Sequence, residues 1–535
     1  MSLSGNEIAK QSARGSLLLL LGNMTSNFIL LLASLIIARL LHPEAYGTYV
    51  LALIPPTIFW LFTGLGLNTA VTRFAAYHIS RGEVEEAKRI SRNAISILLL
   101  IGAVMSLLDY LTAPFVSSVI LHRPSLTPYV ELSSIVVLGQ AATQSAVSAF
   151  IGWSKYAHAS ITTAAQATTK VILSLFLILA GFGVFGAVLA QVVSYLAVGL
   201  IAVAVFFAIN LRGSHSDMKQ TMEDVRSALR FGLPSHIGSY ISQFATQNYL
   251  VLVLSAIVVT TGGSAVGFFQ AALNVTVAIT VFSTSFASAL LPAFASLEGK
   301  QANTSIAFTY AVKIVGALVL PIVVFVIADS NLLIRLFYGT AFVPAGNILA
   351  LLSVSYVPMV IGLTVFPSYF NGIGKTRLTM AALLANAGIM FLLAPLLGLL
   401  FGTYGLAYAF IISNFATAIL ALILAKRFLG SGIDYWAASR TLIAGAVSYL
   451  ALLGIARYTH FSLVTSLFFD LVVFLIVYST ILPITRAIDS QDVAGLIVAG
   501  GNLGILSRPL SWVLKYEDWI IGKSGGKKIA KAPTE

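Results

Sequence analysis

The residues best suited to chemistry are polar side chains that interrupt long apolar stretches, and Lys170 is the most informative of them. It lies near the middle of the apolar stretch 159–181, about 17 Å from either end of a helix that rises 1.5 Å per residue. Gln166 precedes it by one turn on the same helix face. This pattern favours a cation that meets an anionic ligand in a wet cavity. The alternative is a structural ion pair with Asp109 or another buried acid.

Further basic residues lie near the ends of apolar stretches. Lys313 is about nine residues into the stretch 304–328 and is a second candidate for binding the substrate. The alternative is that its ammonium partly reaches the headgroup region. Arg14, Arg73 and Arg230 lie at helix ends predicted to be cytoplasmic. They indicate contacts with lipid headgroups, or alternatively a cytoplasmic vestibule for a phosphate-bearing substrate.

Amide side chains form two pairs with a spacing of four residues. Asn23 and Asn27 make the first pair, and Gln243 and Gln247 make the second. A spacing of four places each pair on one helix face. The pairs predict either a central polar cleft or hydrogen bonds between neighbouring helices. Asn274 supports the cleft by the same argument, more weakly.

The composition explains why these polar groups need a special environment. The chain has 535 residues, of which 58% are hydrophobic and only 9% are charged, and its mean hydropathy is +0.94. Soluble domains carry about 25% charged residues. Apolar runs of about 20 residues are long enough to cross a bilayer as helices. The sequence therefore predicts an all-α polytopic membrane protein.

We place about fourteen transmembrane helices along the chain. Their expected ranges are 15–41, 45–72, 93–121, 129–153, 159–181, 184–211, 231–258, 265–296, 304–328, 345–370, 376–400, 403–427, 437–457 and 463–486.

Basic residues predict the orientation. Of the 31 lysines and arginines, 25 fall on one side of the predicted membrane and four on the other. Because cytoplasmic loops carry the excess of Lys and Arg, both termini are predicted to be cytoplasmic in the cell (plasma or inner) membrane. The net charge of +12 is thus a topology signal and does not indicate binding to nucleic acid.

An internal repeat organises the helices into two lobes. The segment 23–75 recurs 220 residues later, and the residues around Phe150, Gly152 and Lys155 recur at the same offset. Six helices separate the two copies, so the repeats are parallel and related by a pseudo-twofold axis along the membrane normal. The expected domains are an N-terminal six-helix lobe (1–212), a cytoplasmic linker (213–230), a C-terminal six-helix lobe (231–428), helices 13 and 14 (429–486) and a cytoplasmic interfacial tail (487–535).

Catalytic and metal-binding patterns are missing from the sequence. There is no cysteine, no cluster of metal ligands, no nucleotide-binding loop and no nucleophile elbow in context. We therefore predict no enzyme activity, no catalytic residue, no metal and no cofactor.

Several short segments resemble a known family. These segments are 38–49 (ARLLHPEAYGTY), 64–70 (GLGLNTA), Arg73-Phe74 and 289–294 (ALLPAF). They are similar to polysaccharide (O-antigen or lipid-linked oligosaccharide) flippases of the multidrug/oligosaccharidyl-lipid/polysaccharide exporter superfamily, and the resemblance covers helices 1–12.

The resemblance implies two six-helix bundles that alternate access to a central cavity. It implies flipping of a polyprenol-(pyro)phosphate-linked oligosaccharide from the cytoplasmic to the outer leaflet, with basic cavity residues receiving the pyrophosphate. Membrane lipids are the expected surroundings, and glycosyltransferases of the same pathway are possible partners. The alternatives are a cation-coupled multidrug exporter of the same superfamily, a lipid-linked peptidoglycan-precursor flippase and, last, a membrane glycosyltransferase. The lack of acids in the first helix of each repeat speaks against the drug exporter, and very short external loops speak against the glycosyltransferase.

Overall fold

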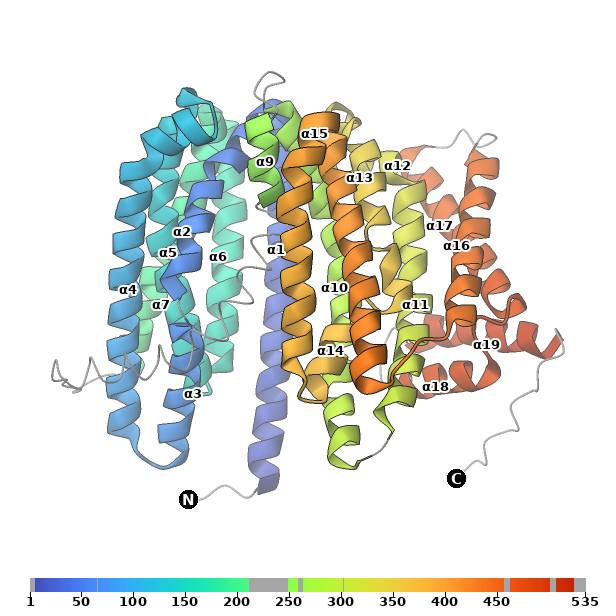
Figure 1. The fold of residues 1–535 in the computed structure, drawn as a ribbon. Coiled ribbons are helices and arrows are strands. Elements are labelled where there is room, and N and C mark those ends of the chain that lie inside the picture. The colour runs from blue at the N-terminus through green and yellow to red at the C-terminus, as the bar shows by residue number, and fades with distance from the viewer. Residues whose placement is uncertain are drawn as a thin grey trace. The chain divides into compact units, whose positions relative to one another are not determined.

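Helices make up the regular structure of the computed structural model wherever it describes the chain (Figure 1). The described residues are 5–64, 66–210, 249–257, 263–301, 303–456, 462–500 and 507–523. They form two compact units, Met1–Gln270 and Ala271–Glu535.

The first unit contains the helices that carry Lys170. Its elements are α1 (Gly5–Ala52), α2 (Ile54–Gly64), α3 (Leu67–Ser80), α4 (Val84–Phe115), a π-helical turn (Val116–Ile120), a 3₁₀ turn (Pro124–Leu126), α5 (Thr127–Gly152), α6 (Tyr156–Leu177), a second π-helical turn (Ile178–Phe182), α7 (Gly183–Asn210) and α9 (Tyr249–Ile257). Helix α6 packs against α1, α5 and α7.

Small residues allow the helices of this unit to approach closely. A Cβ on Gly139 of α5 would lie 2.7 Å from the backbone nitrogen of Leu196 in α7. A Cβ on Gly199 of α7 would lie 2.7 Å from the hydroxyl of Thr143 in α5. Membrane helices associate through such packing because the bilayer gives little hydrophobic drive between them. The α5–α7 pair is therefore a close-packed support for α6.

The second unit contains the remaining helices. They are α10 (Ser264–Gly299, which begins in the first unit), α11 (Thr304–Ala328), α12 (Ser330–Tyr338), a 3₁₀ turn (Thr340–Phe342), α13 (Ala345–Val354), a second 3₁₀ turn (Val357–Ile361), α14 (Val365–Gly372), α15 (Thr376–Leu429), α16 (Tyr435–Ala456), α17 (Leu463–Ile484), α18 (Ser490–Gly500) and α19 (Ser507–Lys523).

Sharp backbone breaks occur where the sequence predicts turns between helices. Helix α1 turns at His42 (φ 60°, ψ 170°), directly before Pro43, because proline disfavours the helical conformation of the residue before it. Gly183 (φ 50°, ψ −128°) and Gly402 (φ 59°, ψ −135°) break the chain in nearly the same conformation. Positive φ at these two positions suits glycine, which has no Cβ.

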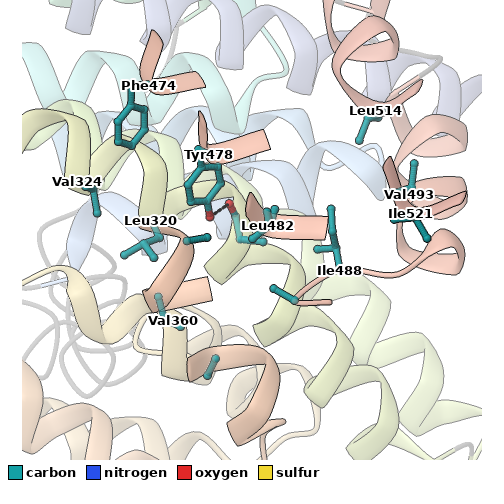
Figure 2. Close-up of a cluster of buried hydrophobic side chains, with 14 of the residues drawn as sticks. Leu320, Val324, Val360, Phe474, Tyr478, Leu482, Ile488, Val493, Leu514 and Ile521 are labelled. Atoms are coloured by element: carbon teal, nitrogen blue, oxygen red, sulfur yellow. Dashed lines mark hydrogen bonds between the residues drawn. The ribbon is translucent and has the colours of Figure 1, made fainter. Parts of the chain in front are cut away.

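The C-terminal helices are joined by a shared apolar core (Figure 2). Phe474 and Tyr478 of α17 pack with Leu320 of α11, Leu514 of α19 and Val493 of α18. Helices α18 and α19 run crosswise to α10 and α11 (Figure 1). This arrangement fixes the described segments 488–500 and 507–523 to the helices of the second unit.

The internal repeat is visible in the backbone. The N–H of Lys155 donates to the carbonyl of Phe150 at 2.8 Å, and the N–H of Lys375 donates to that of Phe370 at 2.7 Å. Both lysines are N-caps, at φ −91°, ψ 57° and φ −93°, ψ 47°. The same turn at an offset of 220 residues supports one duplicated unit.

The predicted fold class is confirmed, with ten apolar segments among the described residues that are long enough to cross a membrane. Three of them, Gly22–Ser80, Tyr156–Asn210 and Thr376–Leu429, are 54 to 59 residues long and contain the breaks at His42, Gly183 and Gly402. The count of fourteen stays a prediction, because most of the expected span 231–258 and the linker 213–230 lie outside the described residues.

Candidate functional site

A polar stripe runs along helix α6 on the face that is turned into the first unit. It consists of Thr162, Gln166, Lys170 and Ser174, each four residues from the next. Thr162, Gln166 and Ser174 are buried, and Lys170 is half-buried. The sequence predicted the face shared by Gln166 and Lys170 from their spacing of four, and the stripe brings this cation and carboxamide together among apolar helices.

Gln166 belongs to a buried hydrogen-bond network that crosses three helices. Its amide nitrogen donates to the hydroxyl of Ser194 in α7 at 3.2 Å, and Ser194 donates to the carbonyl of Gln191 at 2.9 Å. The hydroxyl of Tyr49 in α1 donates to the side-chain oxygen of Gln191 at 3.5 Å. The sequence analysis missed Ser194, Gln191 and Tyr49. The available signal was the Gln191–Ser194 spacing of three in an otherwise apolar stretch.

Lys170 lies two turns along α6 from a contact that fixes α6 against α1. The Ser26 hydroxyl donates to Thr163 at 3.2 Å, and Ser26 is 5% exposed. Within the described residues, Lys170 has neither a hydrogen bond nor an ion pair. A lysine inside an apolar bundle is costly unless an anion or water accompanies it. Its ammonium is therefore a candidate ligand for an anion.

The alternative ion pair between Lys170 and Asp109 is not formed. Asp109 lies in α4 with 0% exposure, and both of its carboxylate oxygens lack a hydrogen-bond partner among the described residues. Asp109, which the sequence analysis named as a possible ion-pair partner of Lys170, is thus enclosed elsewhere in the bundle.

Asn23 and Asn27 lie on the exposed side of α1. Neither makes a hydrogen bond with another described residue, and the buried Ser26 provides the contact between α1 and α6. One of the two predictions for this pair was hydrogen bonding to neighbouring helices of the same lobe, and the described residues show no such bond for Asn23 or Asn27. Their place in a substrate cleft stays a prediction.

Lys313 is held by two carboxylates of the C-terminal segment. Its ammonium lies 2.5 Å from Asp492 Oδ2 and 3.2 Å from Asp489 Oδ2. Asp489 caps α18 by accepting from the N–H groups of Gln491 and Asp492, and Asp492 accepts from the N–H of Asp489. This reciprocal capping box starts the helix, and the ammonium of Lys313 offsets part of the negative charge of the two carboxylates. The structure thus gives Lys313 a structural role that the sequence analysis did not anticipate.

The other predicted site residues are placed as follows. Asn274 of α10 is half-buried, and Arg73 of α3 is exposed with its guanidinium 5.9 Å from the ring centre of Phe74. Arg14 lies within α1. Gln243, Gln247 and Arg230 lie outside the described residues.

The second unit contains an apolar cavity of about 380 Å³. Helices α10, α11, α17, α18 and α19 line it, and Phe325, Phe474 and Leu514 form much of its wall. Among the described residues that line the cavity, Glu517 is the one acid, and it is 5% exposed. Burial raises the pKa of Glu517 to about 7, although a hydrogen bond with Ser479 opposes this shift. The cavity suits a hydrophobic chain.

A family model described as polysaccharide biosynthesis protein matches residues 12–298 of the chain. No curated protein matches.

Several solved structures share the fold. A lipid II flippase MurJ in an inward closed conformation superposes with a TM-score of 0.72 at 14% identity, covering 87% of this chain and 98% of that one. An inward-facing multidrug resistance MATE family transporter of the MOP superfamily has a TM-score of 0.60 at 17% identity, with coverages of 75% and 94%. A MOP superfamily transporter from Pyrococcus furiosus has a TM-score of 0.53 at 18% identity, with coverages of 78% and 95%. At these identities the likeness shows the fold.

Proposed function

Because the chain belongs to the polysaccharide biosynthesis protein family, we propose that it flips a polyprenol-(pyro)phosphate-linked oligosaccharide from the cytoplasmic to the outer leaflet by alternating access. It is a membrane transporter by fold, and the family gives no reason to expect an enzyme. We place it in the cell membrane with both termini in the cytoplasm, on the basis of the charge distribution in the sequence.

The observation that carries this proposal is the unpaired ammonium of Lys170. A (pyro)phosphate is the part of such a substrate that cannot enter hydrocarbon without a counter-charge. Lys170 supplies a positive charge, and Gln166 lies beside it on the stripe. Charge-assisted hydrogen bonds to phosphate oxygens are short and strong, so one lysine in a low-dielectric setting contributes substantially.

The lipid part of the substrate requires apolar surroundings. The cavity beside α17 provides such a lining, and we assign it a stretch of the polyprenyl chain. Asn23 and Asn27, which are exposed on α1, are assigned to the sugar hydroxyls together with Gln243 and Gln247. Arg14, Arg73 and Arg230 are assigned to the cytoplasmic entrance.

The test uses purified protein in proteoliposomes with a fluorescent polyprenyl-pyrophosphate-linked oligosaccharide. Translocation is followed as the fraction of fluorophore that a membrane-impermeant quencher reaches. We expect Lys170→Met to reduce the initial rate about tenfold to a hundredfold, since a hydrogen bond to a charged group contributes about 1.5–3 kcal/mol. Lys170→Arg keeps the charge and should retain much of the rate.

Lys300→Met is the matched control, because Lys300 is exposed in the loop after α10. Its rate should equal that of the wild type. Translocation by Lys170→Met at the wild-type rate, in protein that elutes as a single species, would refute the assignment of Lys170.

The second candidate is a drug exporter, and the similarity to a MATE family transporter is what favours it. Lys170 would repel a cationic drug. If the protein exports such drugs, the Lys170→Met variant should therefore export them faster than the wild type. Efflux of ethidium from cells that express each variant separates the two functions. A peptidoglycan-precursor flippase is distinguished by offering lipid-linked substrates with different sugars in the same vesicles.

A further inference from the structure

Two contacts set the register between α11 and α17 in the second unit. The Tyr478 hydroxyl of α17 donates to the carbonyl of Ala317 in α11 at 2.9 Å, and Figure 2 shows Tyr478 and Phe474 on the side of α17 that faces this core. The rings of Phe474 and Phe325 are 5.8 Å apart between centroids. From the first contact to the second, the residue number falls from 478 to 474 along α17 and rises from 317 to 325 along α11. The two helices are therefore antiparallel.

One turn further in this register, the antiparallel helices bring two acids together. Asp470 precedes Phe474 by four residues, and Asp329 follows Phe325 by four residues at the end of α11. A spacing of four keeps each acid on the same helix face as the phenylalanine. The two carboxyl groups therefore extend the α11–α17 contact beyond the ring pair.

Both carboxyl groups are enclosed and incompletely bonded. Asp329 is 8% exposed and Asp470 is 4% exposed. Asp329 Oδ2 and Asp470 Oδ1 are buried oxygens that have no hydrogen-bond partner among the described residues. Two enclosed carboxylates near each other, each with an unpaired oxygen, are unfavourable when both are charged.

The electrostatics agree with this geometry. Burial, and in addition the charge of Asp470, raises the pKa of Asp329 to about 7.

Other titratable groups on the surrounding helices do not balance the acids. Helix α11 also carries Lys313, which is paired with Asp489 and Asp492 at the other end of the helix. Helix α12 carries an exposed Arg335 and the phenol of Tyr338, while α17 carries Tyr478, which donates to Ala317. Helix α16 carries Arg440, which donates to the carbonyl of Arg486, and two tyrosines. None of these groups makes an ion pair with either acid in the described structure.

We propose that Asp329 and Asp470 form a binding site for one monovalent cation, a proton or Na⁺, and that its occupancy holds α17 against α11. A proton bound to one carboxyl turns it into a hydroxyl donor for the unpaired oxygen of the other. A sodium ion takes oxygen ligands from both. This inference does not depend on the transported substrate.

The sign of the proton effect follows from linkage. A carboxyl whose pKa is raised in the folded state binds more protons folded than unfolded, so its stabilisation is complete below its ordinary pKa. That stabilisation is lost as the pH rises to about 7. Thermal unfolding of the full chain in detergent is measured between pH 5 and pH 8.5, in NaCl and in choline chloride of equal ionic strength. All variants carry Glu517→Gln, because the pKa of Glu517 is also raised to about 7.

The reference protein carries Glu517→Gln and no other change. For a proton site, its Tm should fall by about 3 °C or more from pH 5 to pH 8.5 in both salts. For a sodium site, NaCl but not choline chloride should restore the Tm at pH 8.5. The double variant Asp329→Asn/Asp470→Asn should be insensitive to both changes. Asp434→Asn, an exposed aspartate in the same unit, should behave like the reference. Equal pH and salt responses in the reference and double variant would overturn the proposal.

Infrared difference spectra keep the test decisive if the double variant does not fold. Between pH 5 and pH 8.5 the carbonyl band of protonated carboxylic acids should lose intensity in the reference protein. Asp470→Asn alone should remove part of this change, and Asp434→Asn should leave it intact. If Asp470→Asn leaves the change in this carbonyl band unaltered, the proposed site is contradicted.

Discussion

Gly47 and Gly267, which are 220 residues apart, pack backbone against backbone. A Cβ on Gly47 would lie 3.0 Å from the nitrogen of Gly267, and one on Gly267 would lie 3.3 Å from the nitrogen of Gly47. The same contact is made crosswise, with Gly47 against the Gly263 carbonyl and Gly267 against the Pro43 carbonyl. Pro43 and Gly263 are themselves repeat equivalents, so the contact is reciprocal, as a twofold axis requires.

We expect that side chains at this crossing destabilise the protein. Gly47→Ala and Gly267→Ala each place a methyl group against a rigid backbone, so the Tm in detergent should fall by several degrees for either variant. Gly388→Ala in α15 is the control, since a Cβ there meets nothing within 4 Å. Replacing a helical glycine by alanine in open space should raise stability slightly. Unchanged Tm values for both Gly47→Ala and Gly267→Ala would contradict the close contact.

The sequence was informative where local chemistry decides the outcome. The turns at His42, Gly183 and Gly402 were placed correctly, because proline and glycine act on the backbone next to them. The face shared by Gln166 and Lys170 was also placed correctly, because helical periodicity fixes it.

Long-range pairing was not readable in the same way. Lys313 and Asp489 are 176 residues apart, and no periodicity within either segment indicates their contact. The span expected at 345–370 divides into α13, a 3₁₀ turn and α14, and Gly362 has a positive φ of 99°. Helix α4 begins at Val84 and not at residue 93. Ion pairs with a spacing of three, such as Lys88–Glu85, stabilise a charged first turn that the apolar pattern of the sequence does not reveal.

The Lys313 ion pairs predict a double-mutant cycle. Asp492 is almost fully buried, so Lys313→Met leaves a carboxylate without its counter-charge and should cost roughly 3 kcal/mol of unfolding free energy. Asp492→Asn in the same protein should restore a large part of this loss. Lys515→Met, which removes an exposed lysine from α19, serves as the control. A loss in the double variant equal to the sum of the losses in Lys313→Met and Asp492→Asn alone would show that the ion pair has no energetic coupling.

Glu517 predicts a loss of stability as the pH rises. Burial raises its pKa from 4.5 to about 7, so the folded state holds a proton that the unfolded state releases. The unfolding free energy should therefore fall between pH 4.5 and about 7, by at most about 3 kcal/mol at 1.36 kcal/mol per pKa unit. Glu517→Gln should remove this part of the pH dependence in detergent-solubilised protein. Glu298→Gln, at an exposed position of α10, should keep this pH dependence. A Glu517→Gln curve that parallels the wild type would contradict the burial of a neutral acid.

The Asp109→Asn variant tests whether Lys170 needs the carboxylate of Asp109 as a counter-charge. Its carboxylate is enclosed in α4 with two unpaired oxygens, and it forms no ion pair with Lys170. Asparagine has nearly the same shape and no charge, so Asp109→Asn should match or exceed the wild-type Tm. If Lys170 meets the substrate and not Asp109, this variant should translocate lipid-linked oligosaccharide at the wild-type rate, whereas Lys170→Met should not. A tenfold loss of translocation in stably folded Asp109→Asn would instead show that the two residues work as a pair in another state of the transporter. The conserved-charge variant Asp109→Glu would then be expected to recover the rate.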